Sequence, residues 1–408
     1  MHYGWVVVAA SFVVGVAGYG TYFSFTLFYP SLVQEFGWTR TAVSGALSLG
    51  LIGYGLCALP MGWCVDRYGP RITVVCGGVL LGTGTALSGF ISELWHLYAL
   101  YGGITAIGMG AAWAPLVSTI SRWFLDKRGL AIGLGCIGGG TGTFFVAPVV
   151  DLLLVHVGWR EAYVWLGLGC GTLIIAAALL LERDPQAKGL LRFGEQLDGQ
   201  PSAAVNVPDT HATRRYQHLG EIARTRAFWY LSATFGLWWF AGAIVFVQIA
   251  PYVLENGFDL RFAATVTVAF GAGNAVGKIV MGLLADHIGG VAAFQLSTML
   301  AAVAMFGLTL VTGQPQWLWM TALFGCGFGG GTPQLTTIGV ALFGLEAVGT
   351  LMGALLALVG LIGAGGPLLS GVIFDQFHSY TSAYYLGAAV LAIAAISAFG
   401  LRRQVPAA

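Results

Sequence analysis

The sequence predicts an all-α polytopic membrane protein whose twelve transmembrane helices form two pseudo-symmetric six-helix bundles. Composition is the first observation, because 57% of the 408 residues are hydrophobic and only 9% are charged, whereas a soluble domain carries about 25% charged residues. The second is a series of apolar stretches of membrane-spanning length, and the third is a loop motif that occurs twice, once in each half. With a mean hydropathy of +0.81, the chain is expected to lie in the lipid bilayer.

Apolar stretches of about 20 residues mark the spans in order. The first six cover residues 5–29, 42–64, 72–91, 95–118, 129–153 and 162–181. The second six cover residues 227–253, 262–285, 292–312, 317–341, 348–374 and 381–401. The N-terminal stretch has no basic leader and is too long for a cleavable signal, so we interpret it as the first transmembrane helix.

A polar, unpatterned stretch separates the two sets of spans. It predicts an N-terminal six-helix bundle over residues 1–181, a cytoplasmic central loop over 182–226 and a C-terminal six-helix bundle over 227–408. Within the loop, residues 216–226 suggest a short amphipathic piece.

The basic residues predict the orientation. With a cytoplasmic N-terminus, three basic residues lie outside, namely Arg40, Arg160 and Arg261. Fourteen lie inside: Arg67, Arg71, Arg122, Lys127, Arg128, Arg183, Lys188, Arg192, Arg214, Arg215, Arg224, Arg226, Arg402 and Arg403. The positive-inside rule therefore predicts a multi-pass protein of the cell (inner) membrane with both termini in the cytoplasm.

Several function classes are disfavoured by the sequence. A net charge of +1 without a long basic run argues against a nucleic-acid partner. The six cysteines form no CxxC pair, so we expect neither a metal site nor a disulfide framework. The GxGxxG pattern at 325–330 lies in an apolar helix and follows no strand, which excludes a nucleotide-binding loop. We expect no cofactor and, because no nucleophile–base pair is evident, no enzyme activity.

An internal repeat indicates two related halves. Residues 62–71 read GWCVDRYGPR after the second span, and residues 282–289 read GLLADHIG after the eighth. The offset between the two copies matches the spacing of the two sets of spans. Related halves that face a midplane site are typical of secondary transporters. The first copy resembles the GxxxDRxGxR loop motif of the major facilitator superfamily, and the resemblance extends over all twelve spans.

A second motif narrows the resemblance. Residues 123–138, WFLDKRGLAIGLGCIG, resemble the fifth-helix signature of the monocarboxylate transporters, a group that includes the bacterial oxalate/formate exchangers. Residues 3–5, YGW, are similar to a reduced form of that group's first-helix signature.

Lys278 is the strongest candidate for a binding residue. It lies well inside a span, where a charge costs at least ~2.5–3.5 kcal/mol, and we expect it to face the cavity and pair with an anionic substrate. The alternative is that it snorkels to the cytoplasmic face. Asn274 lies one turn earlier on the same face and can orient the substrate. The resemblance implies an acid/arginine pair at this spacing in the monocarboxylate transporters and asparagine/arginine in the oxalate exchangers.

Other site candidates come from the helices that the resemblance places around the cavity. A tyrosine hydroxyl, an indole or an amide there can donate to a carboxylate, although lipid-facing or packing roles remain open for each. The substrate candidates are Tyr22, Phe23, Trp113, Trp239, Gln248 and Gln334, in addition to Lys278 and Asn274.

Charged residues near span ends suggest coupling and gating. For proton coupling we consider Lys278, Asp151 and Asp375, although the positions of the last two favour an interfacial role over a relay role. An aspartate at a helix boundary can pair with an arginine or with the N-terminal amides of another helix, and the alternative is a solvated loop charge. The gate candidates are Asp66, Arg67, Arg71, Arg122 and Asp286.

The predicted function is secondary active transport of a small organic monocarboxylate, such as lactate or pyruvate, with a proton, by rocker-switch alternating access. Its partners are the organic anion, the proton and the lipid bilayer, and we expect it to work as a monomer. The alternatives are an organic anion exchanger of the oxalate/formate kind or a proton-driven drug exporter. A sensor with a transport fold is the alternative from outside transport.

Overall fold

The computed structural model describes residues 2–195 and 219–402, and the named elements in both ranges are helices. The first half of the chain begins with α1 (Tyr3–Phe23), α2 (Phe25–Phe36), α3 (Arg40–Tyr68), α4 (Pro70–Leu87) and η1 (Ser88–Phe90). It continues with α5 (Leu94–Leu97), η2 (Tyr98–Thr105), α6 (Ala106–Met109), η3 (Gly110–Ala112), α7 (Ala114–Trp123), α8 (Arg128–Ala178) and η4 (Pro185–Lys188).

The second described stretch starts in the predicted amphipathic piece with α9 (Leu219–Ile222), whose preceding residues 216–218 lie outside the described residues. The helices that follow are α10 (Arg226–Glu255), α11 (Leu260–Ile288), α12 (Gly290–Gly307), α13 (Gln314–Phe343), α14 (Val348–Gly363), α15 (Gly365–Phe377) and α16 (Thr381–Arg402). The basic residues Arg214, Arg215 and Arg403 lie outside the described residues.

The expectation of twelve transmembrane helices is confirmed. In the described part of the chain, 10 helical stretches are long and apolar enough to cross a membrane. One of them, α8, has 51 residues and breaks at Gly158, whose φ of 79° suits a residue without a side chain. It therefore holds two of the predicted spans. The glycine-rich α13, 30 residues long, completes the set.

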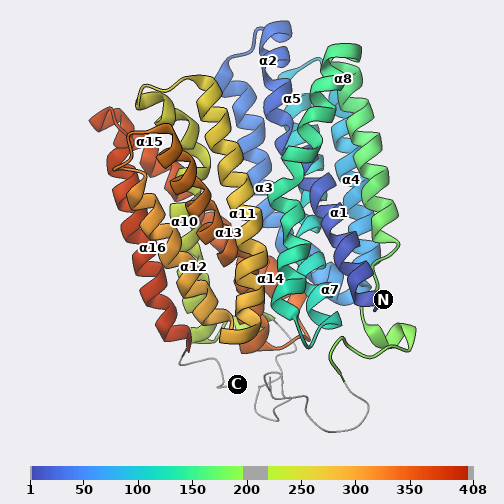
Figure 1. The fold of residues 1–408 in the computed structure, drawn as a ribbon. Helices are drawn as coiled ribbons and strands as arrows, with labels where there is room; N and C mark the ends of the chain where they lie inside the picture. Colours follow the sequence, from blue (N-terminus) through green and yellow to red (C-terminus); the bar gives the residue numbers. More distant parts are fainter. Residues whose placement is uncertain (1, 196–218, 403–408) are drawn as a thin grey trace. The chain divides into compact units, whose positions relative to one another are not determined.

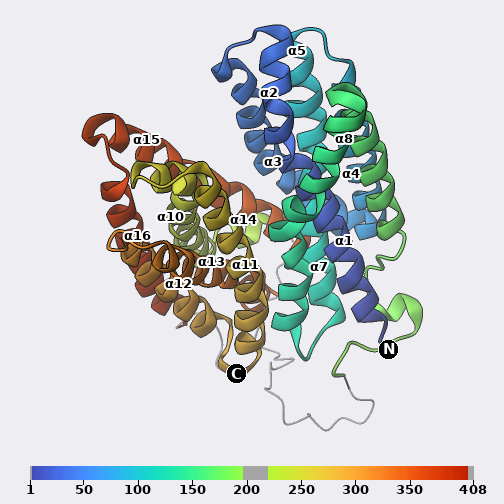
Figure 2. The same ribbon diagram turned by 45° about the horizontal axis from the view of Figure 1, so that its top comes forward.

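The chain divides into two compact units. Unit 1 contains residues 1–125, 134–195 and 347–357, and unit 2 contains residues 126–133, 196–346 and 358–408. Each unit thus includes the first turns of a helix whose remainder belongs to the other unit. The predicted division of the chain at residues 181 and 227 stays a prediction. Within unit 1, α1, α3, α4 and α8 stand side by side, and within unit 2 α10, α12 and α16 do so (Figures 1 and 2).

Glycines allow the helices within each unit to pack closely, as is common where lipid replaces water. In unit 1, a Cβ added at Gly138 of α8 collides with the carbonyl oxygen of Phe12 in α1. In unit 2, a Cβ added at Gly277 of α11 collides with the carbonyl oxygen of Cys326 in α13. The many glycines of the sequence are therefore explained in part by backbone-to-backbone contacts.

Candidate functional site

Lys278 lies in unit 2, on α11, with only 4% of its surface exposed. Among the described residues, it is the one Lys, Arg, Asp or Glu that is buried. Asn274, one turn earlier, is 7% exposed. The Lys278 carbonyl oxygen lies against Gly133, where an added Cβ would collide with it. The first turns of α8 therefore hold the backbone of α11 at the level of the lysine.

Gln334 connects α13 to α11 one turn beyond Lys278. Its Nε2 donates to the carbonyl oxygens of Met281 (3.2 Å) and Gly330 (3.4 Å). Its Oε1 is buried and accepts no hydrogen bond from the described residues. The side chain has 0% exposure. Gln334 is therefore a buried residue of α13 that hydrogen-bonds to α11, the helix of Lys278.

The two other candidates of unit 2 lie on α10. The Nε2 atom of Gln248 donates to Oγ of Ser370 (3.1 Å) and so connects α10 to α15. Trp239 keeps 39% of its surface exposed, and its ring lies against Gly363, where an added Cβ would collide with it. The hydrogen bond to Ser370 gives Gln248 a role in helix packing. Substrate binding by Gln248 or Trp239 stays a prediction.

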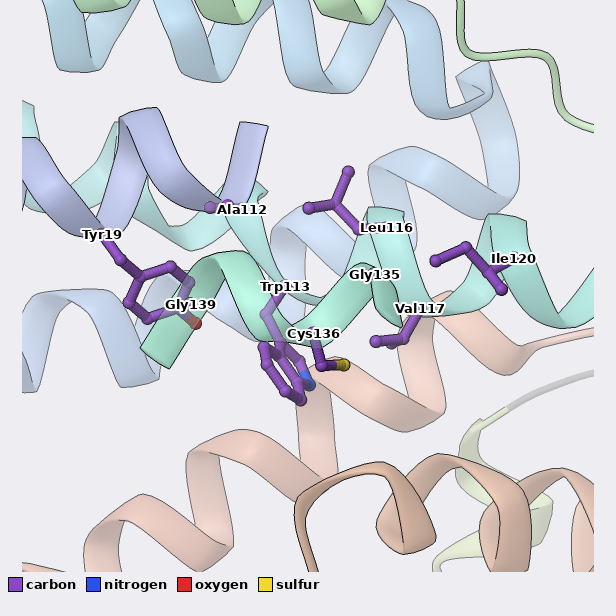
Figure 3. A pocket seen from close by; sticks show the side chains of 10 residues that line it. Tyr19, Ala112, Trp113, Leu116, Val117, Ile120, Gly135, Cys136 and Gly139 are labelled. Atoms are coloured by element: carbon purple, nitrogen blue, oxygen red, sulfur yellow. The ribbon is translucent and has the colours of Figure 1, made fainter. Parts of the chain in front are cut away.

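Unit 1 contains a hollow beside Trp113 (Figure 3). The backbone between η3 and α7 changes direction at this tryptophan, with φ −119° and ψ −68°. Figure 3 shows the side chains of Trp113 and Cys136 next to each other, with the ring of Tyr19 near Gly139. The lining residues are Gly15, Tyr19, Ala112, Trp113, Leu116, Val117, Ile120, Gly135, Cys136 and Gly139.

Tyr19 and its partner Tyr54 were not among the residues predicted from the sequence. Their hydroxyls are 2.8 Å apart, so α3 fixes the ring that borders the hollow. One signal was available: the offset between the two copies of the loop motif also relates Tyr54 to Asn274. The α11 face that carries Asn274 is therefore equivalent to the α3 face beside the hollow.

Tyr22 and Phe23 lie in an aromatic cluster of unit 1. The Tyr22 ring is 1% exposed and stacks on Tyr101 at 5.5 Å between centroids. Its hydroxyl lies against Gly50 and has no hydrogen-bond partner among the described residues. Phe23 stacks on Tyr19 at 6.2 Å. The structure thus places Tyr19, and not Tyr22, at the wall of the hollow.

Asp66 caps the N-terminus of α14 inside unit 1. Its carboxylate accepts hydrogen bonds from the backbone N–H groups of Gly349 (3.1 Å) and Thr350 (2.7 Å), and from the Thr350 hydroxyl (2.8 Å). Arg122 lies 3.6 Å from the same carboxylate. We call this arrangement of Asp66, Gly349 and Thr350 the first latch.

Asp286 makes the equivalent contact inside unit 2. It accepts hydrogen bonds from the N–H groups of Gly129 (2.6 Å) and Leu130 (3.0 Å), at the start of α8. We call this the second latch. The same offset separates Asp66 from Asp286 and Gly129 from Gly349. The repeat therefore includes both the aspartates and the helix starts that they cap, which the sequence analysis did not recognise.

The remaining candidates lie apart from the latches. Arg67 stacks over Trp63, 5.2 Å from the ring centroid. Arg71 pairs with Glu182 at 3.0 Å. Asp151 is exposed on α8. The helix of Asp375, α15, is described, but the side chain of this residue lies outside the description.

The sequence matches the family described as Major Facilitator Superfamily over residues 10–367 and 249–408. It is 30% identical to monocarboxylate transporter 11 of Homo sapiens, over 99% of this chain and 84% of that protein. It is 26% identical to monocarboxylate transporter 12-B of Danio rerio, over 98% of this chain and 87% of that protein.

Solved structures with the same fold include the proton:xylose symporter XylE, with a TM-score of 0.74 and 14% identity over 99% of this chain and 96% of that one. Another is the human organic anion transporter MFSD10, with a TM-score of 0.70 and 16% identity over 97% of this chain and 99% of that one. At such identities these likenesses establish the fold alone.

Proposed function

Since this chain belongs to the major facilitator superfamily and is related to the monocarboxylate transporters, we propose that it moves a small organic monocarboxylate across the membrane together with a proton. Lactate and pyruvate represent the substrate class. The proposal places the protein in the cell (inner) membrane with both termini in the cytoplasm, and it takes the monomer as the working unit.

Burial of Lys278 is the observation that carries the proposal. A charge in the apolar part of a membrane protein is costly unless it is compensated, and only 4% of the Lys278 surface remains exposed. A carboxylate that binds beside the ammonium offsets part of this cost. One buried cation balances one negative charge, which favours a monoanion over a dianion. Asn274, on the same helix face, offers an amide that can orient the carboxylate.

The latches supply the proposed gate. Each aspartate accepts hydrogen bonds from the first amides of a helix, where the helix dipole also favours negative charge. Rocker-switch exchange between outward-open and inward-open states requires contacts that form and break as a unit. We infer that the first latch, at the predicted cytoplasmic end, closes in one state and opens in the other.

Uptake into proteoliposomes tests the binding site. Radiolabelled lactate and pyruvate are supplied to vesicles that contain wild type, Lys278→Gln, Lys278→Arg or Gly271→Ala protein. Gly271 lies on α11 with nothing within 4 Å of an added Cβ, so its substitution is the matched control. We expect Lys278→Gln to abolish uptake, Lys278→Arg to retain part of it and the control to match wild type. Normal uptake kinetics in Lys278→Gln would exclude this site.

A second experiment identifies the ligand class. Thermal unfolding is measured with mono- and dicarboxylates on wild type and Lys278→Gln, because a ligand that binds only the folded protein raises its stability. We expect monocarboxylates to raise the Tm of wild type and to leave the variant unchanged. A larger shift with dicarboxylates would favour an exchanger of the oxalate kind.

Proton coupling is tested by imposing a pH gradient without substrate in the vesicles. We expect the gradient alone to drive accumulation of the anion. Lys278 and Asp151 are the coupling candidates whose side chains are described; because Asp151 is exposed, Asp151→Asn is expected to retain pH-driven accumulation. Accumulation that requires a preloaded anion, and ignores the pH gradient, would indicate exchange.

A further inference from the structure

The segment that follows α8 folds back onto its own unit. Residues 182–195, which we call the strap, contain the short helix η4 and end in a bridge between Phe193 and Phe124. The Phe193 N–H donates to the carbonyl of Trp123 (2.9 Å), and the Leu125 N–H donates to the carbonyl of Phe193 (3.0 Å). The N–H and the carbonyl group of Phe193 therefore both hydrogen-bond the strap to residues 123–125, where α7 ends.

The N-terminus of the chain holds the strap from the other side. A ring nitrogen of His2, Nε2, lies 3.0 Å from the carbonyl oxygen of Leu191. The Lys188 ammonium lies 4.4 Å from the ring centroid of Tyr3, a favourable cation–π contact. Trp5 packs edge-on against Phe193 at 5.9 Å. In Figures 1 and 2 the light-green turn that follows α8 lies beside the N-terminus.

Docking brings a second carboxylate to Arg122. Its Nη1 lies 3.5 Å from Oδ1 of Asp184 in the strap, and its Nη2 lies 3.6 Å from Oδ1 of Asp66 in the first latch. The guanidinium side chain is only 14% exposed, and that of Asp66 is 15% exposed, so solvent screens this pair weakly. The strap and the latch thus share one cation in a partly dry environment.

The repeat gives the second latch no counterpart of Arg122. Asp66 and Asp286 are equivalent, and so are the helix starts that they cap. The position equivalent to Arg122 at the same offset is Leu342. A leucine cannot connect the second latch to any carboxylate. Arg122 and Asp184 are therefore additional to the aspartate–amide contact that both latches share.

We propose that the strap regulates the first latch through Arg122. With the strap docked, Asp184 shares the guanidinium, and the Asp66 carboxylate stays directed at the amides of α14. With the strap released, Asp184 no longer shares Arg122, and the guanidinium competes more strongly with Gly349 and Thr350 for the Asp66 oxygens. Release of the strap then weakens the first latch and leaves the second latch unchanged. This inference concerns regulation and goes beyond the proposed function, because it does not depend on the substrate.

Amide hydrogen exchange on the full chain in lipid nanodiscs tests the proposal. Exchange of the Gly349 and Thr350 amides reports the first latch, exchange at Gly129 and Leu130 reports the second, and trypsin cleavage at strap residue Lys188 reports docking. Two variants separate the steps. Phe193→Ala removes the ring contacts that dock the strap. Asp184→Asn removes the charge and spares η4, because the Asp184 side chain makes no capping hydrogen bond there.

Gln186→Ala is the matched control, since Gln186 is exposed on the same strap. We expect both Asp184→Asn and Phe193→Ala to speed exchange at the first latch by about threefold to tenfold. Only Phe193→Ala should also speed cleavage at Lys188, and Gln186→Ala should change neither. In Asp184→Asn the second latch should exchange as in wild type.

Two results would overturn the inference. The first is faster cleavage in Phe193→Ala with no change of exchange at Gly349 and Thr350. The strap would then pack on unit 1 without affecting the first latch. The second is equal acceleration at both latches in Asp184→Asn, which would indicate general loosening. Neither readout requires transport, so failure of the proposed substrate leaves the test intact.

Discussion

The Asp66 carboxylate accepts a hydrogen bond of 2.7 Å from the backbone N–H of Thr350, which lies in the other half of the sequence. The bond satisfies an amide that the first turn of α14 leaves without an intrahelical partner. Asp286 does the same for the first turn of α8. Each unit therefore stabilises the start of a helix with an aspartate from the loop motif of the repeat.

Removing either aspartate should destabilise the protein to different extents. Loss of an N-cap costs about 0.5–2 kcal/mol, and Asp66 accepts three hydrogen bonds whereas Asp286 accepts two. We expect Asp66→Ala to lower the Tm and the uptake rate more than Asp286→Ala. Thermal unfolding and uptake of the two purified variants, measured side by side, decide the order. A greater loss in Asp286→Ala would contradict this ranking.

Two glycines of α11 should respond in opposite ways to alanine. An added Cβ at Gly277 collides with the carbonyl oxygen of Cys326, whereas one at Gly271 has nothing within 4 Å. Forcing the helices apart costs about 1–3 kcal/mol, while alanine at the open site stabilises by about 0.4–1 kcal/mol. We expect Gly277→Ala to lower the Tm and Gly271→Ala to leave it unchanged or raise it. Equal Tm values would show that the seam between α11 and α13 is looser than the structure indicates.

The bond between Gln248 and Ser370 predicts a measurable coupling. Their side chains meet at 3.1 Å between α10 and α15, and a typical buried hydrogen bond contributes about 0.5–1.5 kcal/mol. We expect a double-mutant cycle with Gln248→Leu and Ser370→Ala to give a coupling free energy in this range. Uptake by Gln248→Leu is measured in parallel. Loss of uptake without loss of stability would support the predicted role of Gln248 in substrate binding.

Two tyrosines near the end of α1 have different surroundings: Tyr19 lines the hollow, and Tyr22 lies in the aromatic cluster. Tyr19 shares a hydrogen bond with Tyr54, and the Tyr22 hydroxyl is buried without a hydrogen-bond partner among the described residues. We expect Tyr22→Phe to leave the Tm and uptake near wild type, because it removes an unsatisfied buried group. Tyr19→Phe should lower the Tm, because it removes the hydrogen bond to Tyr54, which is worth about 0.5–1.5 kcal/mol. Equal Tm values for the two variants would show that this hydrogen bond does not stabilise unit 1.

Much of the fold could be predicted from local patterns. Hydropathy fixes the twelve spans because a lipid-embedded helix needs about 20 apolar residues. The interruption of α8 at Gly158 also has a local cause, since a φ of 79° favours glycine. Residues 126–133 belong to unit 2 and residues 347–357 belong to unit 1. No local pattern indicates this assignment, because it depends on which helix start each aspartate contacts.

Less of the candidate site could be predicted. The charge of Lys278 identifies it in the sequence because a buried ammonium needs compensation, and its repeat equivalent, Ala58, is buried without any charge. Tyr19 and Tyr22, by contrast, are both aromatic residues of the first span and look equally suitable. Their neighbours distinguish them, and neighbours from distant helices are not visible in a single sequence.

By itself the sequence determined the membrane environment, the family, the repeat and the position of the charged Lys278 well inside a span. Hydropathy, charge and motif spacing are properties of the chain alone. Tertiary structure decided which groups meet: Asp66 with the start of α14, Gln248 with Ser370, and Arg122 with both Asp66 and Asp184. A hydrogen bond or an ion pair exists only at contact distance. Contact distances between residues far apart in the sequence are set by how the helices pack.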